Sequence, residues 1–208
     1  MREVDWYFDP ISPYAYLAHV ELPTLAPLAR IHRRPVLFAG LLGHYGNVGP
    51  AEIPPKRQWT YRFCAWQALQ KGIPFVSPAS HPFNPLPRLR LATVLDGEET
   101  AVRRIFEAIW TTGAEAGDPQ RARALALELG VDPLRLDEPA VKERLRAETD
   151  TAAARGVFGV PSLVIDGEVF WGADAIDFAR AYLLDPELLR KPGLTLPEIP
   201  MGAVLRGR

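Results

Sequence analysis

Apolar and polar positions alternate over residues 4–8, as in a half-buried β-strand, and the alternation ends at the turn dipeptide Asp9-Pro10. From residue 14 the apolar positions take helical spacing as far as residue 29, and Pro23 is expected to kink this helix or to end its first part. A second short strand is predicted over residues 35–38, parallel to the first if the connection is a right-handed crossover. Residues 40–55 are rich in Gly and Pro and predict a loop.

Helical spacing dominates residues 56–155, which are divided by helix stop and start signals. The predicted helices cover residues 56–71, 85–95, 98–112, 118–130 and 137–155. Residues 162–165 and 168–171 then predict two strands joined by the hairpin turn Asp166-Gly167. A last helix is predicted over residues 174–184, and the proline-rich tail that follows is expected to lie extended on the surface.

The order of these elements is strand–helix–strand, a helical insertion, then strand–strand–helix, which is the outline of a thioredoxin fold. Val160-Pro161 precedes the third strand, where that fold usually holds a cis proline facing the start of the first helix. Thioredoxins carry Cys-x-x-Cys at that helix start, whereas this chain has Ser12, Pro13, Tyr14 and Ala15. We therefore predict an α/β chain with a thioredoxin-like domain, residues 1–55 and 156–208, and a helical insertion domain, residues 56–155.

Composition narrows the possible functions. The chain has 208 residues and a formal net charge of −1, which favours neither nucleic acid nor an anionic membrane as a partner. Its single cysteine, Cys64, excludes an internal disulfide, and its four histidines form no metal-binding pattern. The first residues show no secretory pattern, so we expect a cytoplasmic protein.

Six motifs in chain order resemble the 2-hydroxychromene-2-carboxylate isomerases and the related kappa-class glutathione transferases, which belong to the DsbA-like thioredoxin superfamily. They are residues 9–19 (DPISPYAYLAH), 46–47 (GN), 54–57 (PPKR), 81–85 (HPFNP), 156–162 (GVFGVPS) and 170–174 (FWGAD). The chain departs from the family pattern at Ala175, where the family often has Arg. The resemblance implies a DsbA-like fold, a homodimer, and glutathione or another low-molecular-weight thiol as cofactor, with no metal.

Two roles are open for Ser12. As the residue before a helix it is a typical N-cap. It also lies where the fold places its sulfur chemistry, and a hydroxyl beside free N–H groups and the positive end of a helix dipole stabilises a thiolate. Lowering the pKa of a free thiol, about 8.5, by about two units contributes roughly 2.7 kcal/mol to thiolate binding. We expect Ser12 to be the catalytic residue, as a hydrogen-bond donor that orients the thiol.

The remaining cofactor contacts are predicted near the C-terminus. A cis bond at Val160-Pro161 is expected to offer the Val160 N–H and C=O to an extended peptide such as glutathione, although this dipeptide also simply shapes turns. Asp174 is expected to cap the last helix, to bind the γ-glutamyl ammonium, or both. The full predicted set of cofactor-binding residues is Ser12, Val160, Pro161, Trp171, Gly172, Ala173 and Asp174.

Substrate contacts are predicted at Asn47, Lys56 and Asn84. Lys56 stands at a helix start, where a cation is unfavourable beside the helix dipole unless an anion faces it, and a solvated lysine is the alternative. Asn47 is expected to bind the substrate's oxygens, and Asn84 either to line the same cleft or to hold its own turn. The helically spaced stripe of Trp59, Arg62, Phe63 and Trp66 is predicted to be core packed against the thioredoxin part rather than a pocket for an aromatic substrate.

These residues and the resemblance together predict a glutathione-dependent isomerase that acts on a small aromatic unsaturated keto acid by reversible thiolate addition. A kappa-like glutathione transferase uses the same site and releases the conjugate. A thioredoxin-fold module that binds extended peptides without catalysis is a third hypothesis. A disulfide oxidoreductase is the weakest, because the motif has no cysteine.

Overall fold

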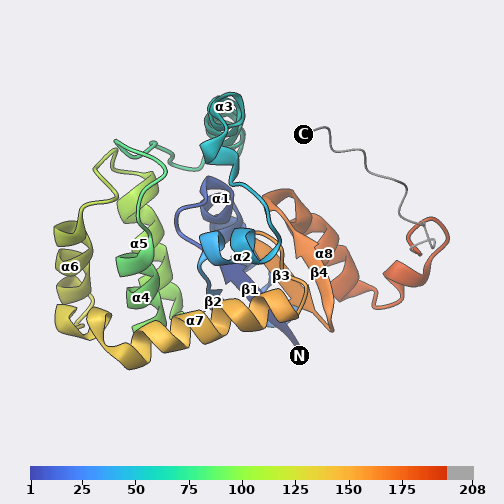
Figure 1. Ribbon diagram of the computed structural model, residues 1–208. Coiled ribbons are helices and arrows are strands. Elements are labelled where there is room, and N and C mark those ends of the chain that lie inside the picture. Colours follow the sequence, from blue (N-terminus) through green and yellow to red (C-terminus); the bar gives the residue numbers. More distant parts are fainter. Residues whose placement is uncertain (196–208) are drawn as a thin grey trace.

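The computed structural model describes residues 1–195 (Figure 1). Its strands are β1 Arg2–Phe8, β2 Ala29–Pro35, β3 Ser162–Ile165 and β4 Glu168–Trp171. Its α-helices are α1 Pro13–Glu21, α2 Phe38–His44, α3 Pro54–Lys71, α4 Leu86–Val94, α5 Glu99–Trp110, α6 Pro119–Glu128, α7 Pro139–Ala154 and α8 Ile176–Leu184. Short 3₁₀ helices are η1 Leu22–Leu25, η2 Pro50–Glu52, η3 Pro133–Asp137, η4 Ala173–Ala175 and η5 Leu188–Arg190.

The four strands form one mixed sheet in the order β2-β1-β3-β4. β1 pairs in parallel with β2, and it pairs antiparallel with β3, so that Trp6 lies between Arg33 and Leu163. β3 and β4 form an antiparallel hairpin whose turn residues, Asp166 and Gly167, both have positive φ. This is the sheet of a thioredoxin fold, so the predicted fold class is confirmed.

Helices cover both faces of the sheet. On one face Val4, Trp6 and Phe8 belong to the main hydrophobic core, with residues of α1, α5 and α8. On the other face Tyr7 and Val164 pack with residues of α2 and the C-terminal end of α7, which lie in front of the sheet in Figure 1. Full burial of apolar side chains of this size contributes about 1.5–3 kcal/mol each.

The segment from α3 to α7 separates β2 from β3 in the chain. α4 contacts α5, α6 and α7, and both α4 and α7 contact β2, so two helices of this segment join it to the sheet. α3 lies apart from them at the upper end of α1 in Figure 1. The division into two domains at residues 55/56 and 155/156 stays a prediction.

Three local predictions were wrong. The second strand is Ala29–Pro35 rather than residues 35–38, because its central residues, Ile31 to Arg34, include three basic side chains that hide the alternation. Residues 40–44 of the predicted loop belong to α2, Phe38–His44, which is anchored by the buried Leu41. In the tail, η5 interrupts the predicted extended chain, and the part of that prediction beyond residue 195 lies outside the described residues. Pro23 acts as expected, since α1 ends two residues before it and η1 follows.

Candidate functional site

Ser12 lies at the N-terminus of α1, between the end of β1 and the first helical residue, Pro13. Its backbone is extended, and its Oγ accepts a hydrogen bond from the Ala15 N–H at 3.2 Å, which confirms the predicted N-cap. The same Oγ lies 3.5 Å from the carbonyl oxygen of Val160, to which its hydroxyl can donate. The Ser12 side chain is therefore held between two segments that are 148 residues apart in the chain.

The loop that leads to Ser12 is fixed by side chains of the helical segment. Trp110, which is fully buried, donates its Nε1–H to the carbonyl of Pro10 at 3.0 Å. His81 Nε2 lies 2.8 Å from the carbonyl of Ile11, and its Nδ1 lies 2.6 Å from the Tyr61 hydroxyl. Burial lowers the pKa of His81, so the ring is neutral at pH 7, with Nε2–H donating to Ile11 and Nδ1 accepting from Tyr61.

Asp9 holds the same loop through both its side chain and its backbone. Its side chain is completely buried and accepts from the N–H of Ile11 at 3.0 Å and of Phe38 at 2.9 Å, while its backbone carbonyl accepts from the Ser12 N–H. Burial raises the pKa of Asp9 to about 7, and the two N–H donors oppose that rise. Asp9 thus joins the end of β1, the start of α1 and the start of α2 through one carboxyl group.

The segment before β3 lies opposite Ser12. The Val160–Pro161 peptide bond is cis, as predicted from the sequence. The Pro161 carbonyl accepts from the Gly172 N–H at 2.9 Å, and the Ser162 hydroxyl donates to the Gly159 carbonyl at 2.7 Å. Within residues 1–195 the Val160 N–H has no hydrogen-bond partner, so it is free to pair with an extended ligand.

Gly172, Ala173 and Asp174 follow directly from this contact. Gly172 has φ +107°, and a Cβ there would lie 2.3 Å from the Asp174 carboxylate, so only glycine fits. Asp174 lies in η4 and does not cap α8, whose N-cap residue is Ala175; the N-cap predicted for Asp174 is wrong, because a 3₁₀ turn precedes the helix. η4 packs against α1, and the Asp174 charge helps burial to raise the pKa of Tyr14 to about 12.

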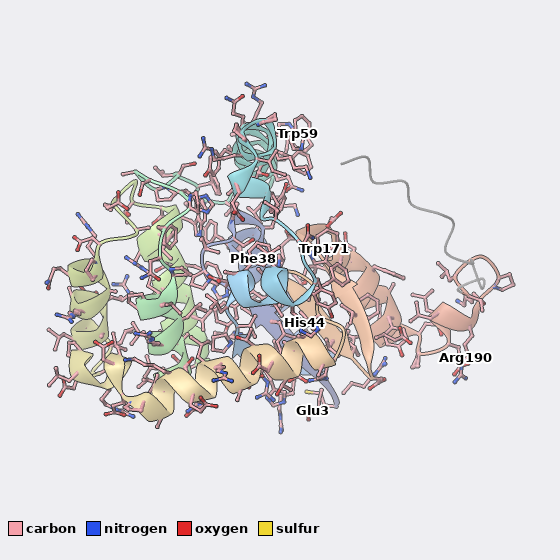
Figure 2. All side chains as sticks on the ribbon, viewed as in Figure 1. Glu3, Phe38, His44, Trp59, Trp171 and Arg190 are labelled. Atoms are coloured by element: carbon pink, nitrogen blue, oxygen red, sulfur yellow. The ribbon has the colours of Figure 1, made fainter. Side chains whose placement is uncertain are left out.

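Trp171 stands beside these residues at the end of β4 (Figure 2). Its side chain is 56% exposed, and its ring packs against Phe158 with centroids 5.1 Å apart. A Cβ at Gly159 would lie 2.7 Å from the Trp171 Nε1, so the glycine lets the indole lie flat over this segment. The two rings form an exposed aromatic wall next to Val160.

The three predicted substrate residues are exposed, and no hydrogen bond within residues 1–195 joins any of them to Ser12. The Asn47 Oδ1 accepts from the Val48 N–H at 2.8 Å, and the Asn84 Oδ1 accepts from the Leu86 N–H at 3.1 Å. Each amide group therefore holds its own turn through its oxygen. Lys56 lies in the first turn of α3 and forms no ion pair with another described residue.

The aromatic stripe of α3 faces solvent. Trp59 and Trp66 are 62% and 54% exposed, and Figure 2 shows Trp59 on the outer side of the helix. Phe63 stacks between them, at 5.6 Å from Trp59 and 5.7 Å from Trp66. Predicting this stripe as core was wrong, because α3 buries a different face, that of Cys64 and Ala68. The pKa of Cys64 is raised to about 12 by burial, which keeps its thiol protonated.

Within residues 1–195 no group of His, Cys, Asp and Glu side chains has an arrangement that holds a metal ion. No helix in this part of the chain is long and apolar enough to cross a membrane.

Sequence reasoning missed Asp9, His81 and Trp110 as residues of the site. Asp9 appeared only in a turn and at the start of a family motif, and His81 appeared only within a family motif. An aspartate directly after an apolar strand and before a proline could have marked Asp9 as a residue of the site. The contact between Trp110 and Pro10 spans 100 residues and has no local signature.

Three comparisons with known proteins find relatives over most of the chain. The family model described as "DSBA-like thioredoxin domain" matches residues 3–184. The 2-hydroxychromene-2-carboxylate isomerase of Sphingobium xenophagum is 34% identical over 193 residues, which cover 88% of this chain and 99% of that protein. A glutathione S-transferase kappa 2 of Caenorhabditis elegans is 26% identical over 210 residues, 89% of this chain and 93% of that protein. A solved 2-hydroxychromene-2-carboxylate isomerase structure superimposes with a TM-score of 0.75 at 28% identity, covering 90% of this chain and 95% of that one.

Proposed function

We propose a reaction for this chain from one premise: it belongs to the DSBA-like thioredoxin domain family and, within it, to the 2-hydroxychromene-2-carboxylate isomerases. The resemblance found in the sequence is thereby confirmed, and the chain belongs to a family of isomerases that has kappa-class glutathione transferases among its relatives. The finer assignment, proposed here, is a glutathione-dependent cis–trans isomerase that acts on an aromatic unsaturated keto acid.

The observation that carries this proposal is the position of Ser12. Its hydroxyl caps the helix start where the fold carries sulfur chemistry, opposite the free Val160 N–H, yet the chain supplies no thiol there. Cys64 cannot substitute, because it is fully buried and its pKa is about 12. The site thus fits an external thiol of peptide character, and glutathione is the thiol that the kappa-class relatives suggest.

Each residue of the thiol site has a separate role in this proposal. With a thiol bound, Ser12 turns its hydroxyl hydrogen from the Val160 carbonyl to the sulfur, and the N-terminus of α1 stabilises the negative charge. Val160 and Pro161 pair with the cysteinyl backbone, with the Val160 N–H as donor. The γ-glutamyl end lies at η4, where Asp174 binds its ammonium and Gly172 and Ala173 leave room for its carboxylate. Trp171 covers the bound thiol from solvent.

Bound glutathione supplies a thiolate that adds reversibly to a conjugated C=C bond, so that the former double bond can rotate before the thiolate leaves. The protein must then hold the keto-acid end still and stabilise the negative charge that develops on its oxygen. Lys56 is the exposed cation available for this, with the free amide N–H groups of Asn47 and Asn84 as donors. A cytoplasmic location and a homodimer stay predictions from the sequence and the family.

The test is the isomerisation of 2-hydroxychromene-2-carboxylate, followed by absorbance with and without glutathione. The proposal predicts that isomerisation requires glutathione and does not consume it. Isomerisation that is independent of any thiol would overturn the cofactor assignment. Loss of free thiol with accumulation of a stable conjugate would favour the transferase that the kappa-class relatives represent.

A further inference from the structure

A cavity lies away from the thiol site, between α1, α5 and α6, and has a volume of about 720 Å³. α1 contributes Tyr16 and His19 to its wall, α4 contributes Arg88, and α6 contributes Arg121 and Leu125. None of the residues proposed above for binding the thiol or the keto acid lines it. α1 nevertheless takes part in both sites, with Ser12 capping its N-terminus and His19 in its last turn.

The acidic residues of the cavity are already neutralised by arginines. Glu99 pairs with Arg33 at 2.7 Å, and Glu128 pairs with Arg104 at 3.0 Å. Glu107 lies within 3.7 Å of both Arg103 and Arg104. Arg88, in contrast, forms no ion pair with any residue in the described part of the chain, and Arg121 has a long contact of 3.9 Å with Asp118.

Arg88 is only 2% exposed. One Nη donates to the Ala116 carbonyl, whereas its Nε has no partner within residues 1–195. Burial lowers the pKa of Arg88 to about 10; Arg121 lowers it further, while Asp118 and Glu115 act in the opposite direction. A buried guanidinium without a carboxylate partner is unfavourable. An anion between Arg88 and Arg121 would offset the cost of burying the Arg88 charge and reduce the repulsion between the two arginines.

The rest of the cavity is suited to an apolar body. His19 is 7% exposed, and its ring packs 5.8 Å from Trp6 and 5.2 Å from Phe106. Its Nδ1 has no partner among the described residues, and burial lowers its pKa to about 4, so the ring is uncharged at pH 7. Aliphatic side chains complete this wall: Val20, Pro23, Pro74, Ala108, Ala124 and Leu125.

We propose that this cavity is a second binding site, which takes a small organic carboxylate with an aromatic or other apolar body. Arg88 and Arg121 bind the carboxylate, and the wall around His19 packs against the apolar part. The apolar part of the wall favours an organic carboxylate over inorganic phosphate. The proposal does not depend on the thiol chemistry, because it uses other residues.

Calorimetric titration of the full-length protein with benzoate, in the absence of any thiol, tests the site. Arg121→Gln changes an exposed arginine of the cavity, and Arg123→Gln is the matched control, two residues further on the same helix and outside the cavity. We expect Arg121→Gln to weaken benzoate binding about tenfold, and Arg123→Gln and Lys56→Met to leave it within about twofold. A crystal soaked with 4-bromobenzoate should show the anomalous bromine peak in the cavity.

Three results would overturn the proposal. The first is no benzoate binding, or equal binding by Arg121→Gln and the parent protein. The second is loss of binding in Lys56→Met, which would place benzoate at the keto-acid site. The third is inorganic phosphate binding more tightly than benzoate in an Arg121-dependent manner, which would assign the cavity to phosphate.

Discussion

The loop before α1 and the first turn of α3 differ in how firmly their polar groups are held, although both are assigned to the same proposed reaction. In the loop, the carbonyls of Pro10 and Ile11 accept from Trp110 and His81, and the buried Asp9 holds the rest. At the start of α3, Lys56 is exposed and unpaired among the described residues. In the proposed reaction, the chain therefore fixes the group assigned to the sulfur, Ser12, and leaves the group assigned to the substrate, Lys56, exposed to solvent.

This difference has a chemical reason. The thiolate must lie in one geometry for addition and elimination to reverse each other, and a shift of 1 Å is enough to cost on the order of 100-fold in rate. An exposed lysine on a long side chain tolerates carboxylates of different shape. Members of one family can thus share the sulfur chemistry and differ in substrate.

The largest expected effect concerns Asp9. Because its pKa is raised to about 7 in the folded protein, it favours folding at acidic pH, and this contribution is lost as pH rises through about 7. Between pH 5 and pH 8 we expect the free energy of unfolding to fall by about 3 kcal/mol through this group, at about 1.4 kcal/mol per pH unit up to pH 7. Urea unfolding of the parent protein and Asp9→Asn at both pH values measures it, and equal pH dependence in the two proteins would contradict the assignment.

Trp110→Phe should have the next largest effect. It leaves the buried Pro10 carbonyl without its donor, which costs about 1–3 kcal/mol of unfolding free energy. Glutathione binding should weaken as well, since the loop carries Ser12. Trp66→Phe is the control, because Trp66 is exposed and donates no hydrogen bond to a described residue; similar stability losses in the two variants would argue against a fixed loop.

Lys56→Met tests the proposed contact between this exposed lysine and the keto acid. Loss of the cation should raise the KM for the keto acid about tenfold, or 1.4 kcal/mol, and leave glutathione affinity unchanged. Arg62→Met removes another exposed cation of α3 and should change neither quantity. A weaker affinity for glutathione in Lys56→Met, with unchanged KM for the keto acid, would place the lysine in the thiol site instead.

The smallest effect is expected for Trp59→Ser. This side chain is 62% exposed and contacts mainly Phe63, so the free energy of unfolding should change by no more than about 0.5 kcal/mol. A larger loss that depends on protein concentration would show that a second copy covers the stripe. Sedimentation measured alongside the unfolding experiment separates these outcomes.

The sequence predicted those parts of the fold that local signals specify. Asp166-Gly167 marked the hairpin, Asp118 with Pro119 marked the start of α6, and Val160-Pro161 marked the cis bond, each through a short motif. β2 was misplaced, because basic side chains occupy an edge strand whose outer face is only half buried.

The candidate site was predictable only in part. Ser12 and Val160 were expected to face each other because the fold brings these motifs together, and the 3.5 Å contact agrees. The support from Trp110 and His81 depends on packing between segments about 70 to 100 residues apart, which no local pattern encodes. The burial of α3 was mispredicted for a related reason: large aromatic residues at helical spacing usually indicate a core face.

Titration calorimetry with glutathione is the most direct test of the proposal that the N-terminus of α1 binds an external thiol through Ser12. We expect binding to the parent protein, a Kd at least about tenfold weaker for Ser12→Ala, and an unchanged Kd for Lys56→Met. Unfolding experiments on Ser12→Ala should show a loss of about 1 kcal/mol from the missing N-cap, with the fold retained. Equal glutathione affinity in Ser12→Ala and the parent protein, or no binding by either, would contradict a thiol site at Ser12.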